Sequence, residues 1–129
     1  MSTDLCVCCS GKVFSHCCMP FLTGKKYPPT PEKLMRSRFS AYALGGYGEY
    51  LLLSWLPALT VSLHAIDLSR RDTEWQSLRV VQAQQAGEQA TVIFDADFVD
   101  AQGVLQTYHE QSQFVRVNKR WLYAGIAVE

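Results

Sequence analysis

Apolar residues recur at helical spacing in the first half of the chain and at alternating positions in the second half. Between residues 34 and 42 they repeat at intervals of three and four, which is the period of an amphipathic α-helix. The stripe consists of Leu34, Met35, Phe39, Ala41 and Tyr42. Thr30 supplies an N-cap, Pro31 suits the first helical position, and Gly45-Gly46 ends the pattern. We therefore predict a helix over residues 31–44.

Two further segments before residue 75 have weaker helical patterns. Residues 47–55 are rich in leucine and stop before Pro57, which predicts a short second helix. Residues 59–69 are helical or irregular, and residues 70–72 are typical of a loop. Residues 25–29 contain two lysines and two prolines, which is typical of a linker.

From Trp75 onward the apolar positions take the period of two that a half-buried β-strand requires. Four strands are predicted, at residues 78–84, 90–100, 105–117 and 121–128. In the second strand one face carries Val92, Phe94, Ala96 and Phe98, and the other carries Asp95 and Asp97. The breaks between strands are short enough for antiparallel hairpins. Helices followed by an antiparallel meander indicate an α+β fold, and the long strands indicate a curved sheet wrapped on helices, a cone.

Composition narrows the range of partners and compartments. The 129 residues fit one ordinary domain, and twelve Lys+Arg balance twelve Asp+Glu, so bulk charge favours neither nucleic acid nor anionic lipid. The N-terminus lacks the basic and apolar regions of a secretory signal. The longest apolar stretch, residues 50–59, is too short to span a bilayer and is interrupted by Ser54 and Pro57. We expect a cytoplasmic protein.

All five cysteines lie within the first eighteen residues. Such a cluster is a metal site or a disulfide knot, and an odd number of thiols in a reducing compartment favours metal. Cys6 and Cys8 form one pair, and Cys17 and Cys18 form another. Because the second pair is adjacent in sequence, it must lie at a turn or helix start for both side chains to converge. Ligand sets that include Cys9 or His16, and redox-active or fortuitous thiols, remain alternatives.

The cysteine segment resembles the SEC-C motif, best known from the C-terminal tail of the preprotein translocase ATPase SecA. That motif reads Cys-x-Cys-Gly-Ser-Gly, then a basic and aromatic stretch, then Cys followed by Cys or His. Carried over residue by residue, it implies that the zinc ligands are Cys6, Cys8, Cys17 and Cys18. The turn residues Ser10, Gly11 and Lys12 and the aromatic Phe14 also match.

Two positions depart from the motif. Val7 stands where Pro is usual, and Cys9 stands where Gly is usual, which matters if that position needs a positive φ. Four thiolate ligands with no open position make the implied zinc structural rather than catalytic. So short a segment would draw most of its folding free energy, on the order of 10 kcal/mol, from the metal. We predict a zinc-binding segment over residues 1–24 and an α+β domain over residues 25–129.

Motifs along the rest of the chain resemble the YchJ family of bacterial proteins. They are Leu34-Met35-Arg36-Ser37-Arg38-Phe39-Ser40-Ala41-Tyr42, Tyr50-Leu51, His109-Glu110-x-Ser112-x-Phe114 and Arg120-Trp121-x-Tyr123-x-Gly125. The resemblance covers nearly the whole chain. It implies an NTF2-like, or cystatin-like, cone that carries an N-terminal SEC-C-like segment, and it implies a fold and a zinc site rather than an activity.

Cones of this type often hold a pocket between helix and sheet, and five residues are the candidates for one here. They are Arg36, Arg38, Glu110, Ser112 and Tyr123. Glu110 and Ser112 share a strand face, whereas His109 points the other way, so no catalytic residue is assigned. Arg36 and Arg38 lie on different helix faces, and one of them could reach Glu110 in a partly buried ion pair. That pair either fixes helix to sheet, or belongs to a pocket that binds an anionic or polar ligand or uses Glu110 as a proton acceptor.

Two functions of different classes follow. The first is a zinc-stabilised adaptor that presents Lys12, Lys25 and Lys26 to a protein partner, with the cone as a second recognition surface or a homodimer platform. The second is an enzyme or small-molecule-binding protein that uses the cone interior. The closed metal site and the lack of an evident acid/base pair favour the adaptor. An open cavity lined by Glu110 and an arginine would favour the second function, and a filled interior would exclude it.

Overall fold

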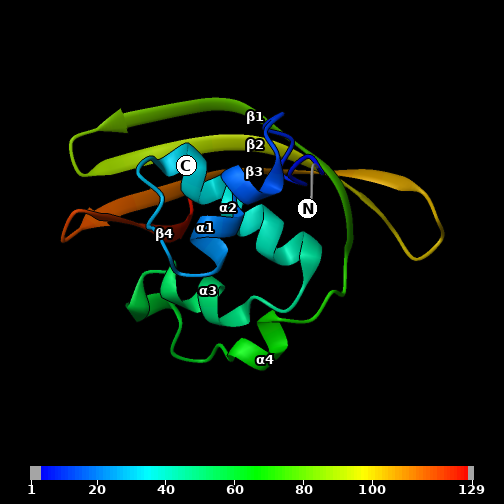
Figure 1. The fold of residues 1–129 in the computed structure, drawn as a ribbon, viewed down its shortest axis with the longest axis horizontal. Coiled ribbons are helices and arrows are strands. Elements are labelled where there is room, and N and C mark those ends of the chain that lie inside the picture. Colours follow the sequence, from blue (N-terminus) through cyan, green and yellow to red (C-terminus); the bar gives the residue numbers. More distant parts are fainter. Residues whose placement is uncertain (1–3, 128–129) are drawn as a thin grey trace.

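A computed structural model describes residues 4–127 as a curved four-stranded sheet with helices on its concave side (Figure 1). The strands are β1 (Glu74–Ala86), β2 (Gln89–Val99), β3 (Leu105–Val117) and β4 (Arg120–Ile126). They pair in sequence order, each antiparallel to the next. The predicted α+β cone with an antiparallel meander is therefore confirmed.

The helices fall into a long central element and several short ones. They are α1 (Met19–Leu22), α2 (Pro31–Leu44), α3 (Gly48–Leu53) and α4 (Ala65–Leu68), with single 3₁₀ turns η1 (Phe14–His16) and η2 (Pro57–Leu59). The ends of α2 are those predicted from its caps. Thr30 Oγ1 accepts a hydrogen bond of 3.2 Å from the backbone N–H of Lys33, and Gly45 ends the helix at a φ of 74°.

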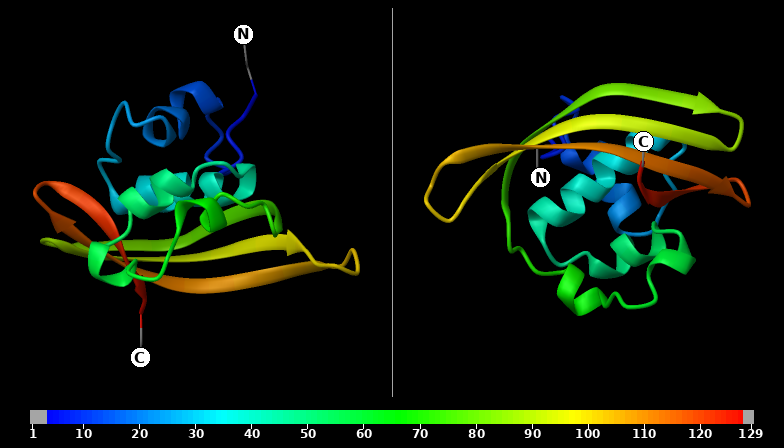
Figure 2. Two further views of the ribbon diagram at one scale, coloured as in Figure 1. Left: turned by 90° about the horizontal axis from the view of Figure 1, so that it is seen from below. Right: turned by 180° about the vertical axis from the view of Figure 1, so that it is seen from behind.

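Helix α2 is packed between the sheet and the N-terminal segment (Figure 2, left). Four residues of the predicted apolar stripe are buried and Tyr42 is half-buried, but Ser37, Arg38 and Ser40 are buried as well. Cys6, Cys8 and Cys18 share one hydrophobic core with residues of α2 and the sheet. The division into residues 1–24 and 25–129 stays a prediction, and in space the N-terminal segment and the sheet pack on opposite sides of α2.

Strand β3 has the predicted range, whereas the other three strands differ from their predicted ranges at the ends. Strand β1 runs from Glu74 to Ala86 rather than over residues 78–84, because its backbone pairing with β2 continues where the side chains are polar and exposed. Register shifts in β1 between Trp75 and Ser77 and between Val80 and Gln82 mark the bends that curve the sheet. Strand β4 runs from Arg120 to Ile126, so Ala127 is not part of it as predicted, and residue 128 of the predicted strand lies outside the described residues.

Helix α1 is absent from the sequence prediction because four residues that include Pro20 show no helical period. Helix α3 is also shorter than predicted, since it covers Gly48–Leu53 rather than residues 47–55. Within residues 4–127 no helix has the length and apolar character needed to cross a bilayer.

Candidate metal centre and ligand pocket

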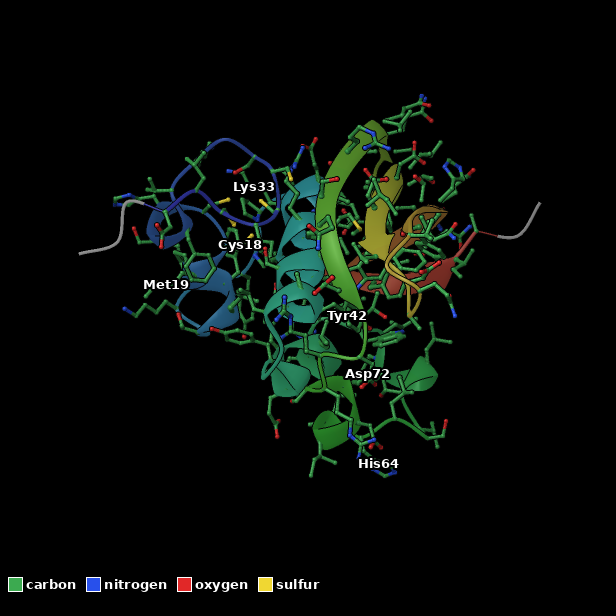
Figure 3. All side chains as sticks on the ribbon, turned by 90° about the vertical axis from the view of Figure 1, so that its right-hand side faces the viewer. Cys18, Met19, Lys33, Tyr42, His64 and Asp72 are labelled. Carbon is green, nitrogen blue, oxygen red and sulfur yellow. The ribbon has the colours of Figure 1, made fainter. Side chains whose placement is uncertain are left out.

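Four cysteine sulfur atoms gather between the N-terminal segment and α2. The Sγ atoms of Cys6, Cys8, Cys17 and Cys18 all lie within 4.8 Å of one another. Cys8 Sγ is 3.6 Å from Cys17 Sγ, which is 4.0 Å from Cys18 Sγ. A tetrahedral ion with bonds of about 2.3 Å to sulfur separates its ligands by about 3.8 Å. The donor set therefore fits a tetrahedral, thiolate-bound metal ion, and Figure 3 shows the sulfur atoms gathered near Cys18.

Local backbone structure brings the two cysteine pairs together. A bridge between Leu5 and Val13 closes the loop that carries the first pair, and the N–H of Cys6 donates to the carbonyl of Lys12 at 2.8 Å. Cys18 is the N-cap of α1, so the adjacent pair lies at a helix start, as the spacing requires.

Cys9 and His16 lie outside this group of four. Cys9 is exposed, and its Sγ contacts the carbonyl of Val7 at 3.6 Å and the N–H of Leu78 at 3.4 Å. His16 is exposed on η1. The φ of Cys9 is 66°, a left-handed conformation that glycine adopts at no steric cost. That value explains why glycine is usual at this position of the motif.

The face of α2 next to the sulfur atoms is polar. Ser40 Oγ lies 3.3 Å from Cys18 Sγ and 3.6 Å from Cys6 Sγ. Arg36 Nη1 donates to the carbonyl of Cys8 at 2.7 Å, so the structure places this candidate beside the cysteines and not in the cone. Hydrogen bonds from Cys18 and Cys8 lower the pKa of the Cys6 thiol, and its bond to Cys6 raises the pKa of Cys18. The cluster thus stabilises a thiolate, the form that binds metal.

A cavity of about 390 Å³ lies on the other side of α2, against the concave face of the sheet. Eight aromatic rings line it: Phe39, Tyr42, Trp55, Trp75, Phe94, Phe98, Tyr108 and Tyr123. The remaining lining residues are Met35, Arg38, Thr73, Ala96 and Glu110. Three of the five pocket candidates, Arg38, Glu110 and Tyr123, therefore meet at one cavity. It meets the condition set above for the small-molecule function, an open space lined by Glu110 and an arginine.

Glu110 accepts hydrogen bonds from three hydroxyl groups. Tyr108 donates to Oε1 at 2.5 Å, and Tyr123 at 2.8 Å and Ser112 both donate to Oε2. Burial, and the neighbouring Glu110, raise the pKa of both tyrosines above the ordinary value. The two phenols therefore stay protonated as donors at neutral pH. Ser112 is fully buried behind the carboxylate and does not line the cavity.

Arg38 is buried at the opposite wall, with 4% of its surface exposed. Its Nη1 donates to the carbonyl of Leu51 at 2.9 Å and to Ser54 Oγ at 2.6 Å. Its guanidinium carbon lies 4.6 Å from the ring centre of Trp55 and 4.5 Å from that of Tyr123. Burial lowers the pKa of Arg38, and the side chain nevertheless remains a cation.

The ion pair between Arg38 and Glu110 that the sequence suggested is not formed. Within residues 4–127 no carboxylate oxygen lies within 4.0 Å of Arg38. The physical reason is Tyr123, whose hydroxyl bonds Glu110 while its ring contacts Arg38. His109 faces away from the cavity, as predicted, and its Nδ1 lies 2.6 Å from Asp95 on the outer face of the sheet.

Sequence reasoning missed Trp55 and Tyr108 as pocket residues. Trp55 reaches the cavity because its segment pairs with β4: Tyr123 N–H donates to the carbonyl of Ser54 at 2.7 Å. The alternation of β3, which puts Tyr108 on the same face as Glu110, was a signal that could have identified Tyr108. No local pattern could have identified Trp55.

Comparison with known proteins agrees with this geometry. A family model described as the YchJ middle NTF2-like domain matches residues 30–125, and one described as the SEC-C motif matches residues 3–20. The chain belongs to the YchJ family. A relative from Serratia proteamaculans, named UPF0225 protein, is 42% identical over 93% of this chain and 80% of its own length. A UPF0225 protein from Deinococcus radiodurans is 36% identical over 95% of this chain and 88% of its own length.

Solved structures share the fold of this YchJ family member. A SEC-C motif containing protein from Rhodopseudomonas palustris is 35% identical, with a TM-score of 0.85 over 96% of this chain and 98% of that one. Another from Psychrobacter arcticus is 28% identical, with a TM-score of 0.82 over 96% of this chain and 83% of that one. The order of N-terminal cysteine segment and NTF2-like cone is thus that of the family.

Proposed function

We propose that this YchJ family member binds a small, largely aromatic molecule inside the cone, and that zinc on four cysteines braces the helix forming the cavity wall. The observation that carries the proposal is the cavity of about 390 Å³ with eight aromatic rings, one arginine and one glutamate. Ligand pockets are typically about 300–1,000 Å³, mostly apolar, with a few placed polar groups.

The sequence alone favours an adaptor over a small-molecule-binding protein, and the cavity reverses that preference. A filled interior would have excluded the small-molecule function, and the interior is open. A protein partner for the exposed Lys12, Lys25 and Lys26, and a homodimer, remain predictions. No reaction is proposed, because Glu110 is already engaged by the hydroxyl groups of Tyr108, Tyr123 and Ser112.

Zinc is the metal we propose for the four cysteines. Thiolate ligands at tetrahedral spacing suit zinc, and four protein ligands leave no position for a substrate. The ion would therefore act on structure, by tying residues 6–18 to α2. Reduced thiols are required for this, which fits a reducing compartment such as the cytoplasm.

The test uses 2-naphthol, a neutral two-ring probe, and two-dimensional NMR of the whole protein. Saturable shifts confined to Met35, Ala96 and neighbouring lining residues are expected. Ala96→Phe should abolish them by filling the cavity, whereas Ala101→Phe in the exposed β2–β3 loop should leave them unchanged. Shifts confined to surface residues, or binding that persists in Ala96→Phe, would contradict the proposal.

A further inference from the structure

The wall of the cavity formed by Arg38 and Trp55 carries hydrogen-bond donors without acceptors. Two hydrogen bonds of Arg38 leave from Nη1, and the hydroxyl of Tyr42 also interacts with the guanidinium. Within residues 4–127, Nε and Nη2 carry more N–H groups than this one hydroxyl can accept. The indole Nε1 of Trp55 is buried and, among the described residues, also lacks an acceptor. Arg38 therefore has unused N–H groups at the cavity wall, and Trp55 beside it has one that is shielded from solvent.

A buried guanidinium without a counterion costs free energy of folding, and a bound anion that pairs with it lowers this cost. The rings of Trp55 and Tyr123 lie 4.6 and 4.5 Å from its carbon and 5.4 Å from each other, so both rings lie to one side of the guanidinium and leave an N–H edge for a partner. That edge is the part of an arginine that pairs with a carboxylate through two parallel hydrogen bonds.

The other wall has the opposite polarity but is already satisfied. Glu110 accepts from Tyr108, Tyr123 and Ser112, which disperse its negative charge. A cationic ligand at Glu110 would compete with these three hydroxyl groups. Arg38 therefore lacks hydrogen-bond acceptors for some of its N–H groups, whereas Glu110 already has donors.

We propose, on the basis of the proposed small-molecule function, that the ligand is a small aromatic carboxylate. Its carboxylate is bound by Arg38, with Trp55 Nε1 as an additional donor, and its ring lies among the aromatic side chains of the sheet. The remaining acceptor capacity of Glu110 is left for a hydroxyl or amino substituent on the ring.

The test compares three probes of nearly equal size on the wild-type protein: 2-naphthoate, 2-naphthalenemethanol and protonated 2-naphthylmethylamine. Because a charge-assisted hydrogen bond is involved, naphthoate should bind about tenfold or more tighter than the neutral alcohol. Equal affinity for all three would overturn this inference and leave the proposed function standing. Tightest binding of the ammonium would overturn it in favour of Glu110. Binding of none would overturn the proposed function itself.

Single-residue variants then show which side chains cause the preference for naphthoate over the alcohol. Arg38→Met should reduce the ratio of naphthoate to alcohol affinity to about one, while Arg36→Met, on the opposite face of the same helix, should leave it unchanged. Trp55→Phe removes the unused donor together with part of the ring that packs on Arg38, and affinity for the alcohol corrects for the lost ring. The ratio should fall severalfold, which keeps the test informative if Arg38→Met does not fold. A preference that survives Trp55→Phe together with Arg38→Lys, or one that disappears in high salt as for exposed charges, overturns the proposal.

Discussion

The hydroxyl of Tyr123 donates a hydrogen bond of 2.8 Å to Oε2 of Glu110. The guanidinium of Arg38 lies over the ring of the same tyrosine. Tyr123 therefore contacts Glu110 through its hydroxyl and Arg38 through its ring, and it separates the two charged groups of the cavity. This arrangement maintains an open, charged cavity where a direct ion pair would close it.

Replacing Tyr123 by phenylalanine should therefore lower the free energy of unfolding by about 1–2 kcal/mol, because a partly buried carboxylate loses one of three donors while the ring stays. Urea denaturation measures the change. Tyr27→Phe is the matched control, since Tyr27 is 67% exposed and its hydroxyl makes no recorded bond within residues 4–127. Equal effects of the two substitutions would show that the Glu110 bond does not stabilise the fold.

The free energy of unfolding should fall in alkaline solution because three tyrosines of the cavity and Tyr50 outside it have raised pKa values. The pKa values of Tyr42, Tyr108 and Tyr123 are raised by burial, and that of Tyr50 is raised by burial to about 12. The unfolded chain loses these protons near about pH 10, whereas the folded chain retains them, so this stability is present below pH 10 and is lost above it. Urea midpoints measured from neutral to alkaline pH test this expectation.

Glu110→Gln provides the control for that pH dependence. Removing the carboxylate should bring the pKa of Tyr108 and Tyr123 down toward the ordinary value, leaving only the contribution of burial. Ultraviolet titration of the phenolate band reports the change. Unchanged titration in Glu110→Gln would mean that the carboxylate does not act on these phenols.

Elemental analysis should find one zinc ion per chain, lost in Cys6→Ser or Cys17→Ser and retained in Cys9→Ser. Serine is isosteric in each case, so the three variants differ only in whether the sulfur belongs to the group of four. Full zinc in Cys6→Ser, or its loss in Cys9→Ser, would show that the ligand set is a different one.

Removing the metal with a chelator should weaken binding of 2-naphthol, because α2 carries the cysteine contacts on one face and Met35, Phe39 and Arg38 of the cavity on another. Affinity measured before and after chelation, and again after zinc is restored, checks this. Undiminished affinity in a metal-free protein would show that the two faces of α2 are independent.

Lys119→Gly should raise the free energy of unfolding by about 0.5–1 kcal/mol, because the two-residue turn between β3 and β4 holds Lys119 at a φ of 66°. The same substitution at Lys33, in the first turn of α2 where φ is helical, should instead destabilise by about 0.5–1 kcal/mol. Destabilisation at both positions would argue against strain in the turn.

The sequence predicted those elements whose signals are local. Thr30 and Gly45 determine the ends of α2, and the turn signals at residues 100–103 and 118–120 bound β3 at its observed range of Leu105–Val117. The divergence of Arg36 and Arg38 follows from the helical period alone. The burial of Arg38 does not, because it depends on the carbonyl of Leu51 and the hydroxyl of Ser54, which only tertiary packing supplies.

Helix α2 also constrains how this architecture can change over evolution. Ser40 and Arg36 on its outward face contact the cysteine segment, while its inward face lines the aromatic cavity. The N-terminal segment therefore cannot be replaced by an unrelated segment, because the replacement would have to pack against the buried Ser40 and the partly buried Arg36. Recombination ahead of Lys25 would be productive only between chains that already share this helix.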